Sequence, residues 1–135
     1  MFKLTLVTPE KKLLTDTEVE EVVVPAYLGE LNILPNHAPL MSTLGIGILK
    51  YRLKGESNFK SAAMSWGYCE VNPTGVNILA ETAETADELD RERVIAAKKK
   101  ANEMLLSGRL SVDEIIKYQR KMRRAQTRLQ LLDEK

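Results

Sequence analysis

The sequence has 135 residues, of which 44% are hydrophobic and 29% charged, a composition typical of a globular domain with room for a small appendage. No apolar run approaches the roughly 20 residues of a membrane-spanning helix, and the N-terminus lacks the pattern of a signal peptide. We therefore expect the protein to stay in the compartment where it is made. The single cysteine, Cys69, excludes an internal disulfide; we interpret it as a small apolar strand residue, with a reactive thiol as the alternative.

The charge is unevenly divided along the chain. The overall formal charge is +1. Residues 1–84 contain seven Lys or Arg and ten Asp or Glu, giving −3, whereas residues 85–135 contain thirteen and nine, giving +4. Such asymmetry indicates two surfaces with different partners. We therefore expect two domains, residues 1–84 and 85–135.

The first part is predicted to be all-β. Apolar and polar residues alternate over short segments, turn residues separate these segments, and no window sustains a helical period. We count eight to ten short antiparallel strands and expect two packed sheets, a β-sandwich. Pro25 and Pro35 are expected to end strands. The clearest segments cover residues 2–6, 18–24, 30–34, 44–49, 51–53, 59–62, 66–71 and 76–80.

A proline-bounded turn follows the third of these segments. Pro35 ends the strand and Pro39 disfavours helix in the residue before it, so Asn36 and His37 are expected on an ordered loop. His37 is the only histidine, which excludes a multi-histidine metal site within one chain. We favour hydrogen bonding in the turn over an acid–base role for His37. The sequence therefore predicts no catalytic residue and no metal site.

The pattern changes to a helical period after residue 85. Asp90 is a good N-cap, and apolar positions recur from Val94 until Ser107–Gly108 ends the run. Ser111 and Glu114 form a capping-box pattern that starts a second helix. We expect an antiparallel hairpin whose contact is thin, because the first helix offers mainly alanines, so that the two helices can come apart. The seam of the second helix is Ile115, Tyr118, Met122, Ala125, Leu129 and Leu132.

The second predicted helix is strongly basic. Between Glu114 and Asp133 there is no acidic residue. Neighbouring cations repel one another, so this face costs stability unless something negative meets it. Three interpretations stay open: a solvated helix face, contact with an acidic protein surface, or a phosphate-bearing ligand. The cations are Lys117, Arg120, Lys121, Arg123, Arg124 and Arg128.

The segment Gly29–Leu40, which reads GELNILPNHAPL, resembles the signature of the epsilon subunit of F-type rotary ATP synthases. The similarity extends over essentially the whole chain, including LTLVTP at residues 4–9, GIGIL at 45–49, LAETAE at 79–84 and LDRER at 89–93. The family has an N-terminal β-sandwich followed by a C-terminal helical hairpin. Asn32 and Trp66 stand where the family usually has glycine. We interpret Trp66 as packing at the sandwich edge, with a partner contact as the alternative.

This resemblance implies a non-catalytic subunit of the central stalk of a proton-translocating rotor. The sandwich would couple the gamma subunit to the ring of c subunits, and the hairpin would inhibit ATP hydrolysis. The basic helix would meet acidic surface on the alpha and beta catalytic subunits. No cofactor is required, and the implied location is the cytoplasmic side of the bacterial inner membrane, reached only through the complex. The implied surface toward gamma and the c ring is Glu30, Pro35, Asn36, His37, Ala38 and Pro39.

The resemblance also implies ATP as a regulatory ligand. Some bacterial epsilon subunits carry an I/L-D-x-x-R-A motif at the start of the first helix and bind ATP between folded-back helices. Here residues 89–94 keep four of the five specified positions, with Val94 in place of alanine. We expect weak binding, about millimolar, because Val94 crowds the base and a lysine lacks arginine's forked contact with phosphate. The implied ATP residues are Glu84, Leu89, Asp90, Arg93, Lys100, Arg124 and Arg128.

Two other classes of protein compete with this interpretation. A nucleic-acid-binding module on a β-sandwich would use the same basic helix, but such modules normally add a positive domain or exposed stacking aromatics. Residues 1–84 are instead net negative. An independent sandwich enzyme lacks the catalytic residues. We therefore expect protein partners and no nucleic acid.

Overall fold

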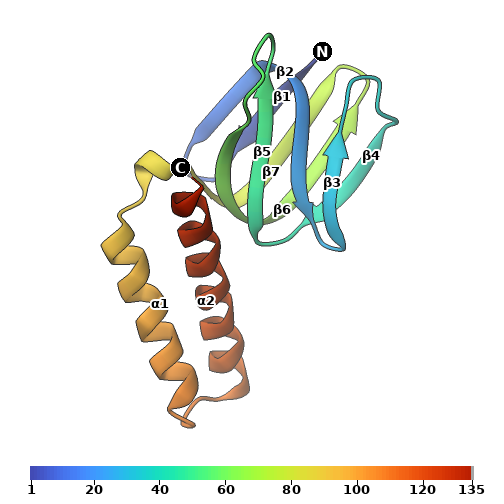
Figure 1. Cartoon of the computed structure of the whole chain (residues 1–135). Helices are drawn as coiled ribbons and strands as arrows, with labels where there is room; N and C mark the ends of the chain where they lie inside the picture. Colours follow the sequence, from blue (N-terminus) through green and yellow to red (C-terminus); the bar gives the residue numbers. More distant parts are fainter. Residues whose placement is uncertain (135) are drawn as a thin grey trace. The chain divides into compact units, whose positions relative to one another are not determined.

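The computed structural model describes residues 1–134, in which seven β-strands are followed by a short 3-10 helix and two α-helices (Figure 1). This architecture confirms the predicted β-sandwich followed by a helical hairpin. The chain divides into two compact units, Met1–Glu84 and a second unit that begins at Thr85. The elements are β1 (Phe2–Val7), β2 (Lys12–Ala26), β3 (Gly29–Ile33), β4 (Leu40–Leu44), β5 (Gly47–Leu53), β6 (Lys60–Asn72), β7 (Gly75–Glu84), η1 (Ala86–Glu88), α1 (Arg91–Leu106) and α2 (Val112–Asp133).

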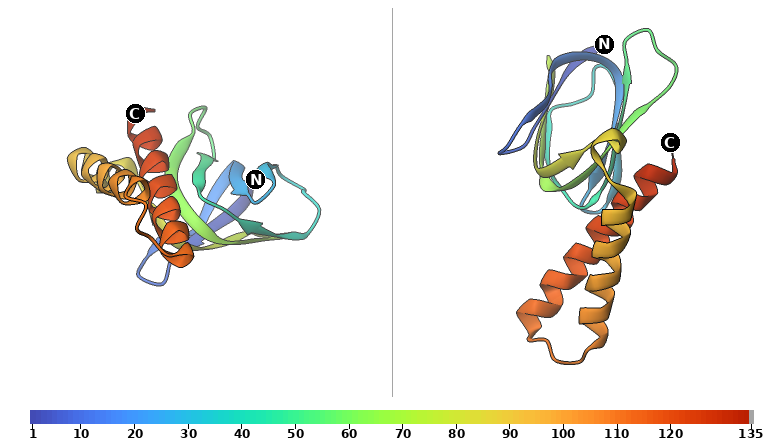
Figure 2. Two further views of the ribbon diagram at one scale, coloured as in Figure 1. Left: turned by 90° about the horizontal axis from the view of Figure 1, so that it is seen from below. Right: turned by 90° about the vertical axis from the view of Figure 1, so that its left-hand side faces the viewer.

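The strands of the first unit form two facing layers around one apolar core (Figure 2). β1 pairs with β2 on one side and with β7 on the other, so the sheet closes on itself. From β7 the order continues through β6, β4, β2 and β3, and β5 bridges β2 and β6. Buried and more exposed residues alternate along most of the strands, whereas the four consecutive residues Ala62–Ser65 of β6 are all buried. The fully buried core side chains include Leu4, Leu6, Ile33, Leu49, Met64 and Ile78.

The described residues contain seven strands and not eight to ten, because β5 and β6 each join two predicted segments into one, whereas β4 was not predicted. Pro25 was predicted to end a strand, but β2 continues through it to Ala26. Pro25 is tolerated because it lies between the last β2–β5 pair, at Val23, and the β2–β4 pair, at Ala26. The missing N–H of Pro25 therefore interrupts no paired position on the side of β2 that faces β4 and β5. One pairing differs from the antiparallel expectation, since β1 runs parallel to β7.

β6 changes partner in its middle, pairing with β5 up to Met64 and with β4 from Gly67 onward. At this step Trp66 has a φ of 35°, in the left-handed region that favours glycine. A Cβ on Gly67 would lie 1.8 Å from the carbonyl oxygen of Leu79, so glycine lets β7 approach closely. Trp66 is half-buried at this step in β6, a strand with neighbours on both sides.

The two helices of the second unit run antiparallel, side by side (Figures 1 and 2). The predicted caps are confirmed, because the Asp90 carboxylate accepts from the N–H of Glu92 at 3.0 Å and the Ser111 hydroxyl accepts from the N–H of Glu114 at 3.2 Å. Gly108, with a φ of 71°, follows the end of α1. The contact between the helices is thin, since the buried residues are only Val94 and Ala101 in α1 and Ala125 and Leu131 in the described part of α2.

Candidate functional site

A hollow of about 250 Å³ lies between α1 and α2. Small alanine side chains on both helices leave space between the two backbones, and long side chains at neighbouring positions border that space. We call this space the interhelical hollow. It is lined by Val94, Ala97, Lys100, Ala101, Tyr118, Lys121, Arg124, Ala125 and Arg128.

The interhelical hollow is lined by four cations and, among the described residues that line it, no carboxylate. Lys100 comes from α1, whereas Lys121, Arg124 and Arg128 come from α2. Like charges held close together repel, so an anion that neutralises them stabilises the site. Guanidinium and ammonium groups donate strong hydrogen bonds to phosphate oxygens. The volume is below the roughly 300–1,000 Å³ of typical small-molecule sites, so the hollow can enclose only part of a nucleotide.

Three of the seven residues implied for ATP binding line this hollow. They are Lys100, Arg124 and Arg128. Val94, where this chain departs from the family motif, lines the hollow as well and is only 7% exposed. A β-branched side chain therefore occupies the place of the motif's alanine, beside the cations.

The other four implied ATP residues do not line the interhelical hollow. The carboxylate of Asp90 caps α1 by accepting from the backbone N–H groups of Glu92 and Arg93, at 3.0 and 3.4 Å. Leu89 is the C-cap of η1, and Glu84 is the last residue of β7, in the first unit. Arg93 is exposed on the first turn of α1. Leu89, Asp90 and Arg93 thus lie around the start of α1, whereas the cations of the hollow lie further along α1 and α2.

Tyr118 and Lys121 were missed as lining residues of this site. The Nζ atoms of Lys117 and Lys121 lie 5.7 and 5.2 Å from the centroid of the Tyr118 ring, within the range of cation–π interaction. The spacing contained the signal, because positions 118, 121, 125 and 128 recur every three or four residues and so share one face of a helix. From the sequence alone, Tyr118 is predicted to belong to the apolar seam of the second helix.

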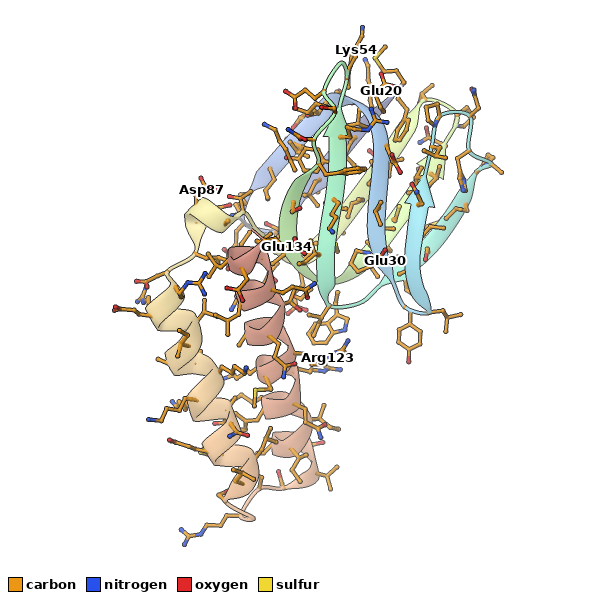
Figure 3. All side chains as sticks on the ribbon, in the orientation of Figure 1. Glu20, Glu30, Lys54, Asp87, Arg123 and Glu134 are labelled. Atoms are coloured by element: carbon orange, nitrogen blue, oxygen red, sulfur yellow. The ribbon has the colours of Figure 1, made fainter. Side chains whose placement is uncertain are left out.

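A second groove, of about 290 Å³, lies on α2 alone and is here called the outer groove. Lys121 and Arg124 line both the outer groove and the interhelical hollow. Arg123, labelled in Figure 3, is exposed and lines neither of them. The residues that line the outer groove are Asp113, Ile116, Lys117, Arg120, Lys121 and Arg124.

The turn between β3 and β4 is held by His37. Its backbone N–H donates to the carbonyl of Leu34 at 3.2 Å, and its Nδ1–H donates to the carbonyl of Ala38 at 2.8 Å. Asn36 has a left-handed φ of 66°. Glu30 lies on β3, close to the turn that joins β2 and β3 (Figure 3). The predicted partner-facing residues are all at least partly exposed: Glu30, Pro35, Asn36, His37, Ala38 and Pro39.

The thiol of Cys69 is buried in the first unit, and its pKa is raised to about 11, mainly by burial and also by the charge of Glu70. It therefore stays protonated at neutral pH, as an apolar strand residue should. Within residues 1–134, no three His, Cys, Asp or Glu side chains gather in a way that could hold a metal ion. None of the helices in that range is long and apolar enough to cross a membrane.

Related proteins align with nearly the whole chain. Residues 1–86 match the family model described as the β-sandwich domain of the ATP synthase delta/epsilon chain. The chain is 44% identical over 130 residues to the ATP synthase epsilon chain of Geobacter metallireducens, which covers 96% of this chain and 91% of that protein. It is 51% identical over 108 residues to the ATP synthase epsilon chain of Bdellovibrio bacteriovorus, covering 76% of this chain and 77% of that protein.

Solved structures share the fold of the chain. A chain of the Euglena gracilis mitochondrial ATP synthase, seen by cryo-EM in rotational state 1, has a TM-score of 0.85 and 23% identity, covering 97% of this chain and 81% of that chain. A chain of the Tetrahymena thermophila mitochondrial ATP synthase, described as central stalk and c-ring, has a TM-score of 0.63 and 17% identity, covering 97% and 96%. At these identities the likeness concerns the fold alone.

Proposed function

Because this chain belongs to the family of ATP synthase epsilon chains, we propose that it is a non-catalytic subunit of the rotor's central stalk. The observation that carries the proposal is the extent of the relationship. A relative of that name aligns with 96% of the chain at 44% identity, so the alignment includes both the sandwich and the hairpin. As a subunit of the complex it is peripheral to the membrane, and its proposed location is the cytoplasmic side of the bacterial cell membrane.

The sandwich is the proposed joint between the gamma subunit and the c ring. A joint that transmits torque has to keep its shape, and this unit closes its sheet through β1 and packs a continuous core. The turn containing His37 is held by two hydrogen bonds, and Glu30 is exposed on β3. Both features present rigid surface to a partner. Solved chains of similar fold come from ATP synthase assemblies described with a c-ring, which is consistent with this role.

The hairpin is the proposed regulatory element. Its thin contact, with only four buried residues in the described part of α1 and α2, allows folded and extended forms. In the extended form the basic α2 would meet acidic surface on the alpha and beta subunits and inhibit ATP hydrolysis. ATP held in the interhelical hollow would favour the folded form, in proportion to its differential affinity for the two forms.

ATP binding to the hairpin is proposed to be weak. The cations Lys100, Arg124 and Arg128 would hold the triphosphate, while the buried Val94 and the small volume of the hollow leave the base poorly enclosed. We expect a Kd of about 1 mM, which corresponds to about 4 kcal/mol. Calorimetry on the full chain checks this, with Arg124→Ala expected to remove the heat of binding. Arg123→Ala removes the same charge from the same helix without touching the hollow and should bind as the native chain does.

The role in the rotor is tested by identifying the subunits that co-purify with the chain. A tagged chain purified from detergent-solubilised membranes should bring gamma, c, alpha and beta subunits with it. Cysteine at position 30 or 37 should then form crosslinks to cysteines placed in gamma or in the polar loop of c. Crosslinks only to outer stator subunits, or purification without gamma and c, would refute the proposed role.

A further inference from the structure

We propose that Met41 is an oxidation site, and that its conversion to methionine sulfoxide by a peroxide weakens the joint between the sandwich and the gamma subunit. The inference rests on the proposed function in the rotor and adds a regulation of that joint. Met41 lies on β4 and belongs to an apolar patch on the outside of the first unit.

The outer face of β4, β6, β7 and β1 carries this exposed apolar patch. Cys69 and Ile78 point into the core, so the neighbouring Tyr68 and Leu79, which lie opposite each other, point outward. Met41 is diagonal to Tyr68 across the β4–β6 pair, at a spacing that long side chains bridge. Contiguous apolar patches on a protein surface commonly mark an interaction site. We call this surface the sheet patch, and it comprises Val7, Met41, Tyr68 and Leu79.

The gamma subunit suits the sheet patch better than the c ring does. The part of c that is proposed to meet the sandwich is a polar loop, whereas an apolar patch gains stability only by being covered with apolar surface. The sheet patch also continues the proposed partner-facing turn, because Pro39 of that turn precedes Met41 by two residues. One partner can therefore cover the turn and the sheet patch together.

The thioether of Met41 is open to an oxidant in solution. Met41 is 67% exposed, whereas Met64 is 2% exposed and lies in the core. Susceptibility of sulfur to oxidation follows its exposure. The thiol of Cys69 does not compete for the oxidant, because it is buried and protonated and the thiolate is the reactive form. A mild peroxide treatment of the free chain should therefore modify Met41 before Met64 or Cys69.

The reaction transfers one oxygen atom from hydrogen peroxide to the sulfur of Met41. The sulfur donates an electron pair to one peroxide oxygen, an S–O bond forms and the O–O bond breaks. The sulfur is thereby oxidised by two electrons, and the other oxygen takes up the proton of the transferred oxygen and leaves as water. Methionine sulfoxide reductases reverse the modification, so the change can act as a switch.

Oxidation makes one member of the sheet patch polar. The sulfoxide oxygen is a hydrogen-bond acceptor, and an apolar partner surface offers it no donor. Burying a polar group without a partner commonly weakens an equilibrium by a factor on the order of ten. We therefore expect the Kd for gamma to rise about tenfold. The fold itself should persist, because Met41 lies outside the buried core.

The test compares the full chain before and after limited treatment with hydrogen peroxide. Calorimetry with purified gamma subunit measures the Kd, and mass spectrometry of peptides locates the added oxygen. The Kd of the native chain should rise about tenfold once Met41 is oxidised, and treatment with methionine sulfoxide reductase should restore it. Bound gamma should also slow the oxidation of Met41.

Two substitutions at position 41 separate this effect from general damage. Met41→Leu keeps an apolar side chain that cannot be oxidised, so it should bind gamma as the native chain does both before and after peroxide. Met41→Gln places a polar group there permanently and should bind weakly in both conditions. Both variants keep the other four of the five methionines as internal controls.

The sheet patch is tested separately from its oxidation. Tyr68→Ser should raise the Kd for gamma, because it removes apolar surface from the centre of the patch. Phe59→Ser is the matched control, since Phe59 is 43% exposed, close to the 45% of Tyr68, but lies between β5 and β6 and outside the patch. It should leave the Kd unchanged. Urea unfolding of each variant confirms that the sandwich is folded.

Several results would overturn this proposal alone while leaving the rotor assignment in place. These are native binding to gamma when Met41 is fully oxidised, native binding by Met41→Gln or Tyr68→Ser, and an equal effect of peroxide on the native chain and Met41→Leu. The last result would place the sensitive residue elsewhere. An untreated native chain that does not bind gamma would instead overturn the proposed function together with this inference.

Discussion

Arg91 and Asp133 join the two ends of the hairpin, with Nη1 of the arginine 2.8 Å from Oδ1 of the aspartate. Arg91 is the first residue of α1 and Asp133 the last residue of α2. Each charge therefore lies at the unfavourable end of its helix dipole, where a cation meets the positive N-terminus and an anion the negative C-terminus. Antiparallel packing brings the two charges together, so each compensates the other only while the hairpin is folded.

Exchanging these two charges should make the hairpin more stable. The double variant Arg91→Asp with Asp133→Arg keeps the ion pair and moves both charges to their favourable helix ends, each worth roughly 0.3–1 kcal/mol at low salt. Urea unfolding followed by helical circular dichroism measures the change. Arg91→Asp alone should be less stable than the native chain, because it faces Asp133 with a like charge. A double variant less stable than the native chain at low salt would contradict this account.

Gly67→Ala should strongly destabilise the sandwich. The new Cβ would lie 1.8 Å from the carbonyl oxygen of Leu79 and 2.9 Å from the Cα of Ala80, and these backbone atoms cannot move without breaking the β6–β7 ladder. We expect a loss of about 3 kcal/mol or more in the free energy of unfolding. Gly45→Ala is the control, because a Cβ there meets no atom within 4 Å and should cost less than about 1 kcal/mol. Similar losses in the two variants would be inconsistent with the close approach.

The start of α2 should depend on pH. The pKa of Glu114 is lowered from its ordinary value of 4.5, first by the backbone N–H of Ser111 and then by its hydroxyl. Because the pKa is lower in the folded state, this contribution is fully present above pH 4.5 and is lost as the pH falls through the lowered folded value. Acid titration of helicity should show a loss below pH 4.5 that Glu114→Gln reduces. Ser111→Ala should cost about 1 kcal/mol at neutral pH, and a titration unchanged by Glu114→Gln would refute the assignment.

The two units should be separable. The buried core of the first unit lies entirely before Glu84, so a fragment ending there should unfold cooperatively and still join gamma and the c ring. ATP hydrolysis by a complex carrying this fragment should rise, because the proposed inhibitory helix is gone. Thermal unfolding of the fragment and the ATPase rate of the complex measure both effects. A fragment without a cooperative transition, or a complex with unchanged hydrolysis, would argue against the division of roles.

Local signals explain what the sequence could predict. The caps at Asp90 and Ser111 depend on a few neighbouring residues, and both are found as expected. The course of β2 through Pro25 depends instead on where two other strands stop pairing with it. The parallel pairing of β1 with β7 joins opposite ends of the unit, so no local pattern could specify it.

The candidate site was also predictable only in part, because it depends on how two helices pack and not on a local pattern alone. The resemblance implied Lys100, Arg124 and Arg128 together, and they share the interhelical hollow. Tyr118 reads as a seam residue because its apolar ring has helical spacing, yet it borders the hollow. Ile115, also assigned to the seam, is 38% exposed.

The tryptophan that lies at the partner change in the middle of β6 is an intrinsic fluorescence probe. Trp66 is the only tryptophan of the chain, and it lies in the first unit. After residue 84 the only aromatic side chain is Tyr118, whereas α1 and α2 supply nearly all of the helical backbone among the described residues. Indole fluorescence therefore follows the sandwich, and far-ultraviolet dichroism follows the hairpin. One unlabelled sample, titrated with denaturant or ATP, reports on the two units through two separate signals.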